Sequence, residues 1–76
     1  MDGNEWIARF SERLGVEVPE PAVIDELLAL AGDAAHSSER IAAPIACYLV
    51  GRAGVDATAA RALAAGIAGQ SEGDAQ

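Results

Sequence analysis

The sequence predicts a small all-α fold, an antiparallel bundle of four helices. Apolar residues recur three and four positions apart, the period of a helix that is buried along one side. Glycine, proline and capping residues divide the chain into four such segments with connectors of a few residues, and short connectors favour antiparallel neighbours. No strand-like alternation bounded by hairpin turns occurs. We expect one helical domain over residues 1–69 and a disordered acidic tail over residues 70–76.

The first helix is expected over residues 5–14. Asn4 is its predicted N-cap and Gly15 its predicted C-terminal stop. One apolar stripe at helical spacing is formed by Trp6, Ile7, Phe10 and Leu14. The pair Trp6 and Phe10 is interpreted as part of the core, with an interface anchor as the alternative.

The second helix is expected to begin at Pro21, since proline suits a first helical turn. Residues 16–20 before it read as an extended connector, because a proline disfavours helix in the residue that precedes it. Two adjacent apolar stripes follow, one through Val23, Leu27, Leu30, Ala31 and Ala34 and the other through Ile24, Leu28 and Ala35. A helix apolar over so much of its circumference is predicted to be the central one.

The third helix is predicted to be kinked or broken near Pro44. Proline would clash inside a helix but fits a first turn, so the regular part should begin near Ala43 or Pro44, after a short helical turn over residues 38–42. It should run to Arg52 and end at Gly54.

The fourth helix is predicted over the alanine-rich residues 57–68. Asp56 is the strongest capping residue in the chain, and Gly69 is the expected stop. Mostly small side chains form its stripe, which permits a close approach between helices: Ala60, Leu63, Ala64 and Ile67. Together with Trp6, Phe10, Leu27, Leu28 and Leu49, the larger of these side chains are expected to supply the core.

Composition excludes several classes of function. The net charge is −7, and five arginines without any lysine are spread among twelve carboxylates, which disfavours nucleic acid and anionic membranes as partners. No apolar run approaches the roughly 20 residues that a membrane-spanning helix needs. The acidic N-terminus lacks the features of a signal peptide, and the single cysteine forms no internal disulfide. We therefore expect a cytoplasmic protein.

The residues that could carry chemistry are few. His36, the single histidine, could act as a proton shuttle or ligand with Asp33 or Glu39, but the simpler interpretation is contact with the last carbonyls of the second helix. Cys47 lacks a second histidine as base and is expected to be buried and inert. Scattered carboxylates around one histidine do not form a metal signature. We expect no catalysis, no metal and no cofactor.

One polar and aromatic surface is the candidate binding site. It comprises a dense polar turn and two residues of the third helix, namely His36, Ser38, Glu39, Arg40, Tyr48 and Arg52. Arginine and tyrosine are enriched at binding hot spots. The alternative interpretation is an ordinary solvated loop.

A succession of short motifs gives the chain a resemblance to a known family. These motifs are Trp6…Phe10…Leu14-Gly15, Ile24-Asp25-x-Leu27-Leu28-x-Leu30-Ala31, Ala35-His36-x-x-Glu39-Arg40-x-Ala42-Ala43-Pro44 and Tyr48-Leu49-x-Gly51-Arg52. The succession resembles a small actinobacterial all-helical domain of unknown function. That domain also occurs at the C-terminus of molybdenum cofactor guanylyltransferase-like proteins. The resemblance covers about residues 5–67 and implies a link to molybdopterin guanine dinucleotide biosynthesis or to molybdoenzyme maturation. The chain has no glycine-rich N-terminal loop and no parallel sheet for nucleotide transfer, so the role implied is an accessory one.

Three functions follow from these observations. The first is a non-catalytic protein-interaction module, whose partner could be a molybdenum cofactor nucleotidyltransferase or a molybdoenzyme. The second is a small-molecule domain that binds a pterin or nucleotide, with Arg40 and Arg52 facing its phosphates. The third is a homodimeric structural domain with the alanine face of the fourth helix as the dimer contact.

Overall fold

Four helices make up the computed structural model, which describes residues 1–74 and contains no strand within that range. They are α1 (Gly3–Leu14), α2 (Pro21–Ser37), α3 (Ala42–Ala53) and α4 (Ala57–Asp74). The predicted all-α fold class is therefore confirmed.

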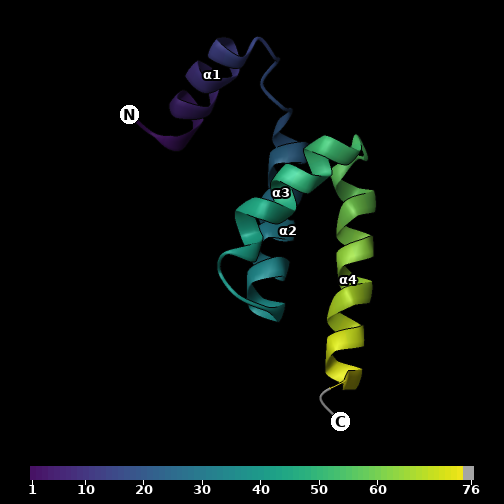
Figure 1. Ribbon diagram of the computed structural model, residues 1–76. Helices are drawn as coiled ribbons and strands as arrows, with labels where there is room; N and C mark the ends of the chain where they lie inside the picture. Colours follow the sequence, from purple (N-terminus) through teal and green to yellow (C-terminus); the bar gives the residue numbers. More distant parts are fainter. Residues whose placement is uncertain (75–76) are drawn as a thin grey trace.

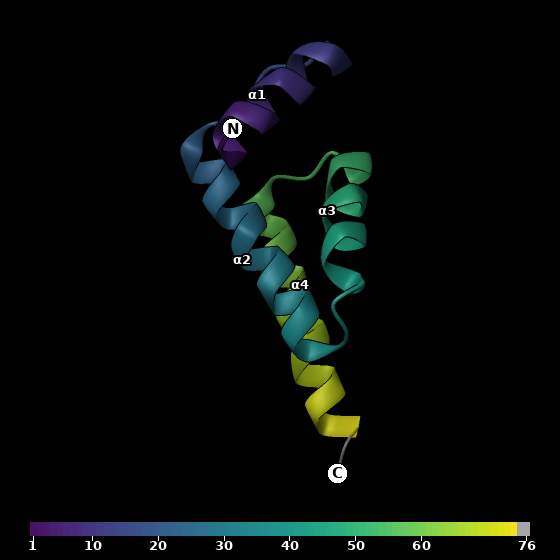
Figure 2. The ribbon, with the colours of Figure 1, turned by 90° about the vertical axis from the view of Figure 1, so that its left-hand side faces the viewer.

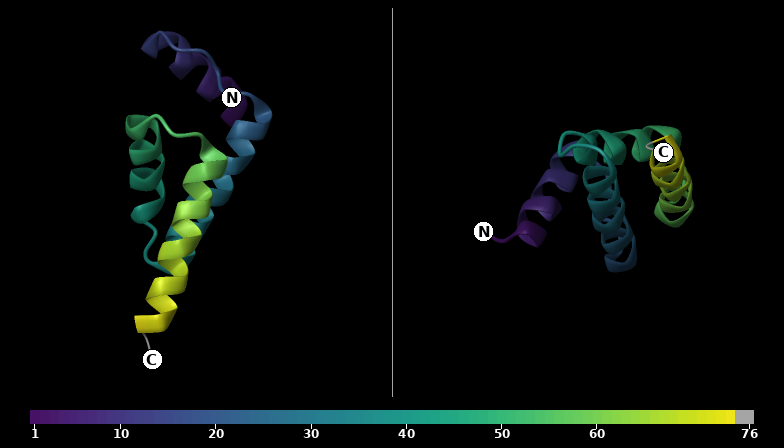
Figure 3. Two further views of the ribbon diagram at one scale, coloured as in Figure 1. Left: turned by 90° about the vertical axis from the view of Figure 1, so that its right-hand side faces the viewer. Right: turned by 90° about the horizontal axis from the view of Figure 1, so that it is seen from below.

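Helix α2 lies at the centre and packs against both α3 and α4. Helices α2, α3 and α4 run in alternating directions, as Figures 1 and 3 show. Helix α1 lies beyond the N-terminal end of α2 rather than along another helix (Figures 1 and 2). The prediction that the second helix is central is confirmed.

Helix α1 begins two residues earlier than predicted. The carboxylate of Asp2 accepts a hydrogen bond from the Glu5 backbone N–H at 2.8 Å, so Asp2 is the N-cap and the choice of Asn4 was wrong. Gly15 ends the helix as predicted, with a left-handed φ of 77°. The N–H of Val16 then donates to the carbonyl of Ser11, which folds the connector back over the last turn of the helix.

Helix α3 accommodates Pro44 in its first turn, as expected. A short turn precedes it, in which the N–H groups of Ala42 and Ala43 donate to the carbonyls of Glu39 and Arg40. Gly54 closes the helix with a φ of 71°.

Helix α4 continues past Gly69 to Asp74, so the prediction that this glycine ends the helix was wrong. Gly69 does not adopt the left-handed φ that stops α1 at Gly15 and α3 at Gly54. The disordered tail predicted over residues 70–76 stays a prediction, and residues 75–76 lie outside the described part of the chain.

Asp56 caps α4, because its carboxylate accepts a hydrogen bond from the Ala59 N–H at 2.8 Å. Replacing Asp56 with alanine leaves that N–H to water and removes a negative charge from the helix N-terminus. We expect the free energy of unfolding to fall by about 1 kcal/mol, measured by urea denaturation. Asp56→Asn keeps the acceptor and should lose a few tenths of a kcal/mol. Equal losses for the two variants would contradict the capping role.

Small side chains fill the contacts that α2 makes with its neighbours. Ala57 and Ala60 of α4 are buried, and Leu30 of α2, 3% exposed, is the most buried large apolar residue. The half-buried side of α3 is formed by Ala42, Ala43, Ala46, Cys47 and Val50. An exposed ion pair between Arg61 Nε of α4 and Asp33 Oδ2 of α2, at 3.1 Å, adds a weak link.

The large apolar side chains lie mostly outside these contacts. Among those expected in the core, six are exposed, namely Trp6, Phe10, Leu28, Leu49, Leu63 and Ile67. That expectation was wrong for Leu63 and Ile67 because α4 turns its alanines towards α2, and for Trp6 and Phe10 because α1 packs along no other helix. Close approach between helices uses small residues, and the bulky ones are left facing solvent.

Candidate functional site

All six residues of the predicted binding surface are exposed. His36 lies in the last turn of α2, while Ser38, Glu39 and Arg40 lie in the connector to α3. Tyr48 and Arg52 stand one turn apart on α3. The cluster therefore faces solvent, but exposure alone does not make it one site.

The structure divides these six residues between different places. His36 lines an open hollow against α4, with Ala64 and Ala68 on the opposite wall. Ser38 and Glu39 line another open hollow, whose apolar part consists of Ile41, Ala42 and Ile45. Over residues 1–74, no hydrogen bond or ion pair joins any two of the six.

Two kinds of partner were considered for His36, the nearby carboxylates and the last carbonyls of α2, and other residues engage members of both kinds. The carboxylate of Asp33 is engaged by Arg61 of α4, rather than by the imidazole. The last carbonyls of α2 are met by hydroxyl groups, since Ser37 Oγ donates to the Asp33 carbonyl and Ser38 Oγ to the Ala34 carbonyl. No hydrogen bond from His36 to these carbonyls occurs in the described residues, and its contact with the end of α2 stays a prediction.

A continuous apolar surface runs along the solvent side of α3. We call it the α3 outer face, and it consists of Ile41, Ile45, Tyr48, Leu49 and Arg52. The last four lie four, seven, eight and eleven positions after Ile41, so all five share one side of the helix. Ile41 is 72% exposed and Ile45 is 57% exposed. Glu39 lies beside the first two residues in a shared hollow.

Sequence reasoning found two members of this face and missed the rest. Tyr48 and Arg52 were selected for their residue type, whereas Leu49 was assigned to the core and Ile41 and Ile45 were not singled out. The sequence did contain a signal for this face, because the opposite side of the same helix carries mostly alanine. A helix with small residues on one side and large apolar ones on the other has two contact faces.

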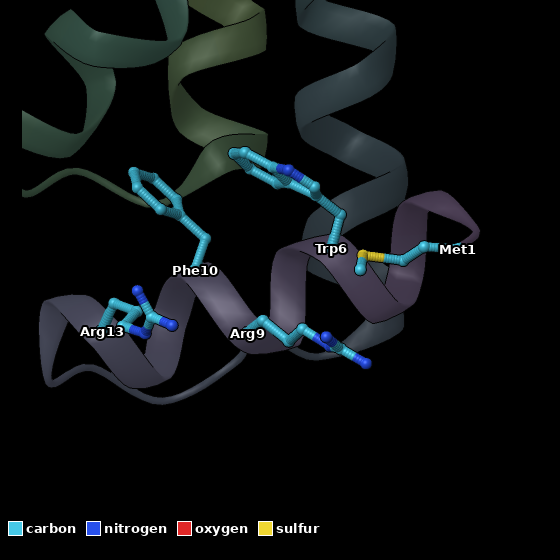
Figure 4. Close-up of a pocket in the computed structure, with 5 residues that line it drawn as sticks. All are labelled: Met1, Trp6, Arg9, Phe10 and Arg13. Atoms are coloured by element: carbon cyan, nitrogen blue, oxygen red, sulfur yellow. The ribbon is translucent and has the colours of Figure 1, made fainter.

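A second exposed apolar surface lies on α1. We call it the α1 apolar stripe, and it consists of Trp6, Phe10 and Leu14, all exposed. The rings of Trp6 and Phe10 lie with centroids 4.9 Å apart and planes tilted by 33°. Figure 4 shows them projecting from the same side of α1, and together with Met1, Arg9 and Arg13 they line an open hollow of about 210 Å³. The interface-anchor interpretation of this pair fits its exposure, and the core interpretation was wrong.

The remaining candidate groups for chemistry lie apart from these two surfaces. No three potential metal ligands come together within the described residues. Cys47 is half-buried between α3 and α2, with its Sγ 3.9 Å from the Leu27 carbonyl oxygen. In the part of the chain that the structure describes, no helix is both long and apolar enough to cross a bilayer. The arrangement offers apolar surface and flanking charges, which suit binding.

The class of protein that this fold defines is a small all-helical domain with two exposed apolar surfaces. The chain belongs to the family described as Domain of unknown function (DUF6457), whose profile matches residues 1–75. This match confirms the coarser part of the resemblance, a small helical domain of unknown function. No curated protein and no solved structure matches the chain.

Proposed function

We propose that this protein is a non-catalytic helical interaction module that binds protein through the α3 outer face. The observation that supports this proposal is the orientation of α3, which turns its alanines towards α2 and its isoleucines, tyrosine and leucine outward. Exposed apolar residues contiguous along a whole helix are typical of protein interfaces. Tyr48 and Arg52, at one end of the face, are residue types enriched at hot spots.

The shape of this face suits a protein better than a small ligand. A small molecule is bound in a concave pocket that buries most of its surface. The α3 outer face is convex apart from one open hollow at Ile41 and Ile45, and neither Arg40 nor Arg52 lines that hollow. A helix or another extended apolar surface of a partner could contact the full length of the face, as two packed helices do.

The finer proposal concerns the cellular context. The resemblance to a domain attached to molybdenum cofactor guanylyltransferase-like proteins supports an accessory role in molybdopterin guanine dinucleotide biosynthesis or molybdoenzyme maturation. We propose that a protein of that system, in the cytoplasm, is a partner.

This proposal is tested by titrating the purified chain into purified molybdenum cofactor guanylyltransferase from the same organism, in a calorimeter. We expect Ile45→Glu to weaken binding at least tenfold, because it places a charge in the middle of an apolar contact. Arg40→Ala should weaken binding less if the connector lies at the rim.

The matched control is Leu63→Glu, the same kind of change at an exposed leucine of α4 that lies outside the α3 outer face. It should bind as the unaltered chain does. Equal affinity for Ile45→Glu and the unaltered chain would refute docking on α3. A lack of binding by the unaltered chain would refute the guanylyltransferase as partner.

A further inference from the structure

We propose that the protein seated on the α3 outer face is a second copy of this chain, which inserts its own α1 apolar stripe there. The inference rests on the proposed function, since it concerns the same face: the second copy occupies the α3 outer face when the guanylyltransferase is not bound, and the two partners compete for it. In the resulting dimer each copy gives its α1 to the other and receives the other's α1 in return. The two contacts are identical and related by a two-fold axis, so the assembly closes at two copies.

The spacing of the two surfaces matches. The α1 apolar stripe has residues at positions 6, 10 and 14, and the α3 outer face has its aliphatic residues at positions 41, 45 and 49. Each row therefore follows the four-residue ridge of its helix and spans about 12 Å at 1.5 Å per residue. Ridges of this kind on two helices interdigitate in the commonest class of helix packing.

Charges at the ends of the two rows fix the direction of docking. Glu39 lies at the start of the α3 outer face and Arg52 at its end. On α1, Asp2 lies at the start and Arg13 at the end, beside the hollow that Trp6 and Phe10 line. An antiparallel placement brings Arg13 towards Glu39 and Asp2 towards Arg52 of the other copy. A parallel placement would oppose charges of like sign.

The chain exposes the area that such a dimer needs. Its accessible surface is 5985 Å², whereas a compact monomer of 7.7 kDa exposes about 4,300 Å². The excess is about 1,700 Å², and a standard stable interface buries about 800 Å² on each partner. The radius of gyration of 13.8 Å similarly exceeds the value of about 11 Å expected at this length. A second copy seated on the α1 apolar stripe and the α3 outer face would cover part of this excess.

The association is measured on the full chain by sedimentation velocity over about 1–200 µM, together with the fluorescence of Trp6, the only tryptophan. We expect a concentration-dependent change from monomer to dimer. The tryptophan emission should shift to shorter wavelength over the same range, because docking removes a 56% exposed indole from water.

A mixing experiment tests the pairing of α1 with α3. Phe10→Glu damages only the stripe, and Ile45→Glu damages only the face; both residues are exposed, so the fold should persist by circular dichroism. Each variant alone should dimerise at least tenfold more weakly than the unaltered chain. An equimolar mixture should recover heterodimer, because one intact contact can form between the stripe of one variant and the face of the other. Leu63→Glu should dimerise normally.

Each other outcome overturns the proposal in a distinct way. Normal dimerisation of Phe10→Glu would show that α3 pairs with α3 instead. A monomer with blue-shifted emission at every concentration would show that α1 docks on its own chain. A monomer with exposed tryptophan would exclude the second copy altogether. In these monomeric cases, the proposed function still stands if Ile45→Glu abolishes binding to the guanylyltransferase, and it fails too if that variant binds normally.

Discussion

Replacing Leu30 with alanine is expected to lower the free energy of unfolding by about 2–4 kcal/mol. Leu30 is 3% exposed on α2, the helix that packs against both α3 and α4. It is three residues from Leu27, whose carbonyl faces Cys47 of α3, and three residues from Asp33, whose carboxylate pairs with Arg61 of α4. Truncation therefore leaves a cavity that no single helix can close by moving.

The loss should be visible as a large change in the folded population. A domain of this length is stable by about 4–11 kcal/mol, so the variant would retain only part of its stability at 25 °C. Urea denaturation followed by circular dichroism measures the change. The matched control is Leu28→Ala on the same helix, where the side chain is 67% exposed and the loss should stay below about 0.5 kcal/mol. Similar losses for the two variants would contradict the described packing of α2.

The second large effect is expected from a substitution that adds volume. Ala60 is 7% exposed on the side of α4 that packs against α2. Leucine at this position would force the two helices apart or take an unfavourable rotamer, at a cost of about 1–3 kcal/mol. The small side chain is thus a requirement of the close approach, and a larger apolar residue should destabilise the protein despite its hydrophobicity.

Thermal unfolding of Ala60→Leu is best compared with that of Ala59→Leu. Ala59 is the neighbouring residue of the same helix and is exposed, so leucine there meets no other helix. A loss of about 1–3 kcal/mol would lower the melting temperature by roughly 4–20 °C in a domain of this size. If Ala59→Leu were the more damaging variant, the face of α4 that contacts α2 would have been assigned incorrectly.

Sequence reasoning predicted the elements of the fold well because their ends depend on local chemistry. Gly15 and Gly54 supply the left-handed conformation that ends a helix, and Asp56 supplies a carboxylate acceptor for a helix start. The two errors are also local. Asp2 and Asn4 are both good N-caps, and Gly69 stops a helix only if the chain turns there.

The sides on which the helices pack could not be predicted in the same way. An amphipathic pattern identifies two sides of a helix, and the usual assumption is that the larger apolar side faces inward. In α4, the alanines face α2, whereas Leu63 and Ile67 face solvent. How closely two helices approach depends on the side chains of both, so the pattern of one helix does not reveal it. Trp6 was predicted to lie in the core because the larger apolar side of its helix was assumed to face inward, but α1 packs along no other helix.

The candidate site was predicted in part. Tyr48 and Arg52 lie on one exposed side of α3, as their spacing requires. His36 and Glu39 are close in sequence but line different hollows, because α2 ends between them and the connector changes direction. Residue type indicated the polar members of the surface, while its apolar members depend on which side of α3 is left uncovered.

The central position of α2 has a consequence for the order of events during folding. Since α3 and α4 each pack against α2, neither has a surface on which to dock until α2 has formed. The connector from α2 to α3 is short, so this hairpin closes at a small cost in chain entropy, whereas the contact between α2 and α4 closes a longer loop that includes all of α3. We infer that the α2–α3 hairpin forms first and that the docking of α4 completes the domain, with α1 free to form its turns independently of both.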